Sequence, residues 1–234
     1  MKFVILLLAV GVTTASIAPS SPLPKGIWAN MEFVETLKRT HNVDSALTAL
    51  GPTSPIIMVT NTDVQCVRDG SPSLATVVTN PTKGLGAQVR VTWSGITWIA
   101  AADDKSGEYI ALHRSDNIEA KPIVFGKMPS KNTDVSFVLS RILNSALLTG
   151  VYIDGKGQQY LFSPAQSAGW KDDVFSYDVE LDWRARRAVL RKKGTTATWS
   201  VHRSGDTLSL SALAKNGSPL RRPPLRLVRT ADKP

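Results

Sequence analysis

FSYDVELDWRA, residues 175–185, is the stretch of the sequence that decides the fold. Apolar and polar residues alternate along its whole length, and this period of two is typical of a β-strand with one face on a core and the other in water. Parallel strands that are buried on both faces lack this alternation, whereas antiparallel strands with one wet face show it. The stretch therefore predicts an antiparallel sheet.

Similar short segments, rich in β-branched and aromatic residues, lie on both sides of this stretch and are separated by Gly, Pro, Asn and Asp turns. They predict strands over residues 56–60, 64–68, 74–79, 88–93, 97–101, 108–114, 151–154, 158–162, 188–192, 198–203, 207–213 and 225–229. Strands and helices do not alternate regularly, which argues against a parallel α/β sheet. About a dozen antiparallel strands in one chain predict a mainly β fold, either an antiparallel β-barrel or a closed sandwich.

Two or three short helices are expected among these strands. Asn30 can cap a helix over residues 31–40, in which the apolar residues fall on one side. Asp44 is placed to cap a second helix, which ends at residue 50 before a Gly-Pro pair. A cap at residues 132–134 predicts a third helix to about residue 148, although its apolar start also fits a strand.

The N-terminus has the layout of a secretory signal peptide. Lys2 gives a basic start, residues 3–12 are apolar, and residues 13–18 are small enough for a cleavage site. The apolar run is shorter than the roughly 20 residues that a membrane-spanning helix needs. The sequence therefore predicts a secreted protein, periplasmic or extracellular, with no transmembrane segment in the mature chain.

Export also suggests how the chain is divided. We expect a signal peptide over residues 1–18, a flexible leader over residues 19–25, and a single β domain with helical insertions over residues 26–230. Cys66 is the only cysteine, so no internal disulfide can form, and this fits a bacterial periplasm better than an animal extracellular fluid. The alternating segment around Cys66 favours a buried, inert thiol over a reactive or intermolecular one.

Positive charge is concentrated near the C-terminus. Residues 184–230 contain twelve Lys and Arg against one acidic residue, Asp206. One interpretation is that these side chains are solvated on strands that pair beside acidic ones. The other is a basic face for an anionic protein or envelope surface, formed by Arg184, Arg186, Arg191 and Lys192. Export and the lack of a known motif argue against nucleic acid as the partner.

Motifs for catalysis or metal binding are not recognisable in the sequence. The three histidines, His41, His113 and His202, are far apart and do not have metal-ligand spacing. Neither a Gly-x-Ser-x-Gly nucleophile motif nor a phosphate or dinucleotide loop is present. We therefore expect no enzymatic activity, no cofactor and no metal site.

The six tryptophans either line a ligand cavity or fill a β core. Trp170 follows Ser167-Ala168-Gly169, a run of small residues that predicts a loop, and it is expected to be the most exposed of the six.

Gly26-Ile27-Trp28 resembles the opening of a lipocalin, in which a Gly-x-Trp motif begins the first strand of the barrel. The hairpin over residues 150–162 is also similar to strands of bacterial lipocalin-like proteins. The resemblance implies that Trp28 closes the barrel floor, and that Arg226 or Arg229 from the last strand packs on its indole. It further implies a small apolar ligand in the barrel mouth. The chain departs from the family in its length and in the helices predicted directly after Trp28.

These observations predict an exported, non-enzymatic binding protein for a small, mostly apolar ligand. Trp28, Trp93, Tyr177 and Trp183 are the residues expected to contact or floor its cavity. The alternative is a protein-binding module, an inhibitor or an envelope partner, that uses the basic face.

Overall fold

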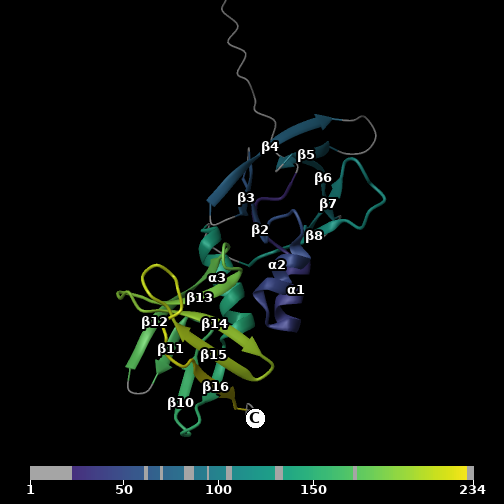
Figure 1. Ribbon diagram of the computed structural model, residues 1–234. Helices are drawn as coiled ribbons and strands as arrows, with labels where there is room; N and C mark the ends of the chain where they lie inside the picture. The colour runs from purple at the N-terminus through teal and green to yellow at the C-terminus, as the bar shows by residue number, and fades with distance from the viewer. Residues whose placement is uncertain are drawn as a thin grey trace, which may run out of the picture.

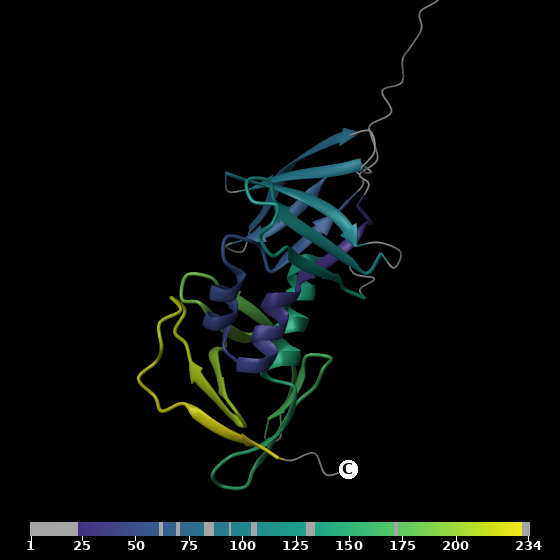
Figure 2. The same cartoon turned by 90° about the vertical axis from the view of Figure 1, so that its right-hand side faces the viewer.

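The computed structural model describes residues 23–60, 63–68, 71–81, 87–93, 95–103, 107–129, 134–170 and 173–230. Within these ranges the chain forms two antiparallel barrels with a layer of helices between them (Figures 1 and 2). The predicted signal peptide lies outside the described residues.

Barrel 1 contains the strands of the N-terminal half. Each strand pairs with the next along the chain, and β1 pairs with β8 to close the sheet. The strands are β1 (Gly26–Asn30), β2 (Ile56–Val59), β3 (Val64–Arg68), β4 (Ser71–Pro81), β5 (Ala87–Trp93), β6 (Ile96–Asp103), β7 (Tyr109–Arg114) and β8 (Ile123–Lys127).

Barrel 2 repeats this meander in the C-terminal half. Its first strand, β9, pairs with both β10 and the last strand, β16. The strands are β9 (Gly150–Ile153), β10 (Gln159–Phe162), β11 (Ser167–Trp170), β12 (Asp173–Asp182), β13 (Arg187–Lys192), β14 (Thr198–Ser204), β15 (Thr207–Ala212) and β16 (Leu225–Arg229).

Three helices lie between the barrels: α1 (Met31–Thr40), α2 (Val43–Leu50) and α3 (Val135–Leu147). Asn30 caps α1 as predicted, because its side chain accepts a hydrogen bond from the backbone N–H of Phe33. The cap of α2 is Asn42 and not Asp44, so this prediction was wrong. Asp134 caps α3, and the strand alternative at the start of this segment is not adopted.

Two hydrophobic clusters hold the molecule together. One fills barrel 1 around Trp28 and includes Leu23, so the predicted leader is partly packed into the core. The other joins the interior of barrel 2 to all three helices, and it reaches Ile27 and Ile56 at the edge of barrel 1. The helices therefore link the two barrels through buried apolar surface, which is the main source of stability in folding.

The predicted fold class is confirmed: the chain is mainly β, its strands form antiparallel barrels, and three short helices accompany them. The strands, which were expected in one antiparallel barrel or closed sandwich, are divided between two barrels. Two strands were missed, β8 and β11, and Trp170 ends β11 and is half-buried rather than lying in an exposed loop.

Barrel 1 closes around its Gly-x-Trp motif. Trp28 is fully buried, and its direct partner on the last strand is Lys127, whose ammonium lies 5.8 Å from the indole centroid. Gly26 adopts φ 142°, a backbone conformation that favours glycine, and a Cβ built on it would lie 3.8 Å from Cε of Lys127. The expectation that Arg226 or Arg229 packs on Trp28 was therefore wrong, because both belong to the last strand of the other barrel.

Barrel 2 closes with the same arrangement. Tyr152 takes the place of the tryptophan and is the direct register partner of Arg229 on the last strand. Gly150 adopts φ 147°, and a Cβ built on it would lie only 3.1 Å from Nε of Arg229. A Gly-x-aromatic motif opposite a basic residue of the last strand thus occurs in each barrel.

Candidate functional site

An aromatic hollow lies at the mouth of barrel 2, which we define by Trp170, Asp173, Phe175, Lys192 and Trp199. These residues come from the ends of β11 and β13 and the starts of β12 and β14. The hollow has a volume of about 630 Å³, which is within the usual range of small-molecule sites.

Trp170 is the centre of the aromatic cluster at this mouth. Its ring centroid lies 5.1 Å from that of Trp199, 6.0 Å from that of Phe175 and 5.7 Å from that of Tyr160. Trp170, Phe175 and Trp199 are half-buried and pack against the cluster that fills the barrel. One side of this aromatic surface is therefore fixed by the core, and the other is available to a ligand.

Lys192 is a charged residue in this otherwise apolar wall. Its ammonium lies 4.5 Å from the centroid of Phe175 and forms an ion pair with Asp173. The positive charge of Lys192 is therefore stabilised both by the face of the aromatic ring and by the carboxylate. The mouth therefore presents aromatic surface without an unpaired charge from Lys192.

The other end of barrel 2 is closed by α3. Ser140 Oγ accepts hydrogen bonds from Nε2 of Gln166 at 2.6 Å and from the backbone N–H of Val179 at 2.9 Å. One turn later, Asn144 accepts a hydrogen bond from the hydroxyl of Tyr177 at 2.6 Å. Burial raises the pKa of Tyr177, so this hydroxyl remains a donor at neutral pH.

The predicted ligand-contacting residues are not brought together. Trp28 is fully buried in barrel 1, and Tyr177 is fully buried under α3 in barrel 2. Trp183 lines a groove beside Phe137 of α3. Trp93 ends β5, and its side chain lies outside the described residues.

The predicted basic face is not a single face. Arg186 pairs with Asp44 of α2, and Arg191 forms a two-pronged pair with Glu180 on the neighbouring strand. Lys192 points to the mouth. Arg184 is exposed and has no ion pair in the described part of the chain. The first interpretation, of solvated side chains on strands that pair beside acidic ones, fits Arg191; Arg186 lies in a turn and pairs with a helix, and Lys192 is half-buried in the mouth.

The histidines lie apart from the mouth. Burial, followed by the nearby Arg203 and Arg229, lowers the pKa of His41 at the end of α1. Among the described residues no three His, Cys, Asp or Glu side chains are grouped as metal ligands would be. Cys66 is buried in barrel 1, where desolvation raises its pKa to about 12 and keeps the thiol protonated.

The mouth could have been found in part from the sequence. Lys192 follows Ala188 and Leu190 at a spacing of two, so the alternation places it on the inner face of β13. Trp199 precedes Val201 in the same way on β14. No comparable signal marks β11, because Ser167-Ala168-Gly169 is poor in strand-forming residues.

No helix in the described ranges combines the length and the apolar character needed to cross a membrane. A scan against models of known families, a search of curated proteins and a search of solved structures each found no match.

Proposed function

We propose that this chain is an exported, non-enzymatic binding protein of the lipocalin-like type, which holds a small, mostly apolar ligand in the mouth of barrel 2. The observation that carries the proposal is the half-buried cluster of Trp170, Phe175 and Trp199 around a hollow of about 630 Å³. Aromatic rings with one packed and one open side are favourable surfaces for flat apolar groups.

The ion pair of Lys192 with Asp173 supports a neutral ligand. Because the pair is formed within the mouth, an anionic ligand would compete with Asp173, and a cationic one would compete with Lys192. A neutral ligand can bury aromatic surface without separating the two charges. We therefore place the neutral, flat end of the ligand against Trp170 and Trp199.

A neutral, environment-sensitive naphthalene dye tests the proposal. We expect saturable binding to quench tryptophan emission by energy transfer, and we expect Trp199→Phe to weaken the affinity roughly tenfold because a phenyl ring offers the ligand less aromatic surface than the indole. Trp183→Phe is the matched control, since Trp183 lies in the groove beside α3. The proposal fails if the wild-type protein does not bind the dye, or if both variants bind it equally well.

A second candidate is binding to an acidic protein through the arm between β15 and β16. Leu220 is 41 % exposed, and the neighbouring Arg221 and Arg222 are exposed and have no ion pair in the described part of the chain. A column of immobilised polyglutamate tests this candidate, because Arg221→Ser/Arg222→Ser should elute at lower salt than the wild type. Equal elution of the two proteins would contradict it.

A further inference from the structure

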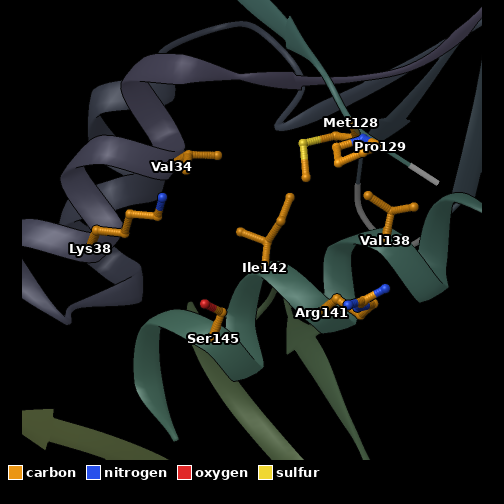
Figure 3. A pocket seen from close by; sticks show the side chains of 8 residues that line it. All are labelled: Val34, Lys38, Met128, Pro129, Val138, Arg141, Ile142 and Ser145. Carbon is orange, nitrogen blue, oxygen red and sulfur yellow. The ribbon is translucent and has the colours of Figure 1, made fainter. Parts of the chain in front are cut away.

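A second hollow lies in the helix layer, away from the mouth of barrel 2. Val34 and Lys38 of α1 line one wall, Arg141 and Ile142 of α3 line the other, and Met128, just after β8, covers part of it (Figure 3). The volume of this hollow, which we call the interbarrel cleft, is about 220 Å³. Since each wall is a packed helix, the cleft is a preformed feature of the fold.

The floor of the interbarrel cleft is apolar. Val34 and Ile142 are buried, and Met128 is half-buried. Figure 3 shows these three side chains directed towards the same space, together with Val138. An alkyl group placed there would lose contact with water on most of its surface, which is favourable.

The charged residues that line the cleft are both cations, Lys38 and Arg141. Neither has an ion pair within the described ranges, whereas the predicted basic residues of barrel 2 are mostly paired. Figure 3 shows the side chain of Lys38 running along the wall with its ammonium turned towards the hollow. The guanidinium of Arg141 lies 5.9 Å from the ring of Phe137 at the other side. An apolar floor beside uncompensated positive charge is complementary to an amphiphile with a negative head.

We propose that the interbarrel cleft binds a medium-chain carboxylate, with the alkyl chain on the apolar floor and the head group at Lys38. At about 30 Å³ for each water-sized group, the cleft has room for about seven such groups, which matches the alkyl chain of a medium-chain acid. This site differs from the mouth in place, size and charge, and it does not depend on the proposed function.

Octanoate is the probe, and the methyl group of Met128 reports its binding. In protein labelled with ¹³C at the methionine methyl groups, we expect the Met128 signal, assigned with Met128→Leu, to shift saturably. Because the charge at Lys38 favours an anion, 1-octanol should bind about tenfold more weakly, and octylamine more weakly still. Butanoate should also bind at least tenfold more weakly than octanoate, since it buries fewer methylenes.

Lys38→Gln keeps a good helix former at an exposed position of α1, so the variant should fold. It should weaken octanoate binding about tenfold and leave 1-octanol binding unchanged. Lys215→Gln, at an exposed position between β15 and β16, is the matched control and should bind octanoate as the wild type does. Both variants should bind the naphthalene dye at the mouth with the same affinity. A loss of octanoate binding can therefore be distinguished from a loss of dye binding.

Three results would overturn the proposal: equal affinity for octanoate and 1-octanol, an unchanged affinity in Lys38→Gln, or equal shifts of all methionine signals. The last would show that octanoate associates with apolar surface in general.

Discussion

Barrel 1 encloses a core of its own, whereas the core of barrel 2 continues through one end into the helices. Both barrels close with a Gly-x-aromatic motif opposite a basic residue of the last strand, Trp28 with Lys127 and Tyr152 with Arg229. In each case a polar atom of the aromatic residue, the indole Nε1 or the phenol oxygen, is buried and finds no hydrogen-bond partner among the residues that the structure describes.

The same strand order therefore encloses two different interiors. In barrel 1, buried residues such as Trp28 and Trp98 occupy the interior and stabilise the fold. In barrel 2, α3 covers one end and fixes the strands with buried polar side chains, while the opposite end retains an aromatic hollow. We therefore expect ligand chemistry in barrel 2 and a supporting role for barrel 1.

The largest effect is expected for Trp28→Ala. Removing a fully buried tryptophan should lower the free energy of unfolding by about 3 to 5 kcal/mol. Because the two clusters are separate, amide hydrogen exchange should accelerate in the strands of barrel 1 more than in those of barrel 2. Equal acceleration in both barrels would show that they share a single cooperative core.

Ser140→Ala tests the dependence of barrel 2 on α3. The variant leaves the buried N–H groups of Val179 and Gln166 without their acceptor, which should cost about 2 to 3 kcal/mol in urea unfolding. Ser145→Ala, at an exposed position of the same helix, should change stability by less than about 0.5 kcal/mol. If the two variants were equally stable, the polar contacts of α3 would not hold this barrel.

Removing one hydroxyl should distinguish the two central tyrosines of barrel 2. Tyr152→Phe deletes a buried hydroxyl that has no hydrogen-bond partner in the described part of the chain, so the free energy of unfolding should stay the same or rise by up to about 1 kcal/mol. Tyr177→Phe deletes the donor to Asn144 and should cost about 1 to 2 kcal/mol. Thermal unfolding at pH 7 compares the stabilities of the two variants. A larger loss of stability in Tyr152→Phe than in Tyr177→Phe would contradict this difference in hydrogen bonding.

The smallest effect concerns His41, whose pKa in the folded state is lowered by burial and by Arg203 and Arg229. The unfolded chain then binds a proton more readily than the folded one, so this residue reduces stability as the pH falls through about 6.5. His41→Asn keeps a side chain that tolerates the left-handed backbone at φ 52°. When the pH is lowered from 7.5 to 5.5, the Tm of His41→Asn should fall less than the Tm of the wild type. The difference between the two falls should be under about 2 °C. A larger fall in the Tm of the variant would contradict a lowered pKa of His41 in the folded state.

Local patterns account for the parts of the fold that the sequence predicted. The alternation of residues 175–185 and the cap at Asn30 depend on neighbouring residues. The cap forms as expected, and the strand forms as β12, although it begins at Asp173 and ends at Asp182, so that residues 183–185 lie in a turn. The division into two barrels depends on pairings between distant residues, such as Trp28 with Lys127, which no local pattern reveals. The Gly-x-Tyr motif at Gly150 was present in the sequence, but its equivalence to Gly26 became visible only with the partners on the last strands.

The site was harder to predict than the fold. Trp170 lies on a strand of small residues that is held by pairing with β10 and β12, so tertiary context overrides a weak local preference. The alternation along β13 places Lys192 on the inner face, but its charge led us to predict an outward-facing side chain. In the structure its ammonium lies over the ring of Phe175. The side chains of three of the four predicted ligand residues are described, and they lie in three different surroundings because aromatic character alone does not separate core from site.

The central claim is that ligand binding occurs at the mouth of barrel 2 and not inside barrel 1. Protein labelled with 5-fluorotryptophan, with ¹⁹F signals assigned by single Trp→Phe variants, tests it during titration with the neutral naphthalene dye. The account predicts saturable shifts of the signals of Trp170 and Trp199, while those of Trp28 and Trp98 stay in place. Shifts of Trp28 and Trp98 with unchanged signals from Trp170 and Trp199 would contradict it.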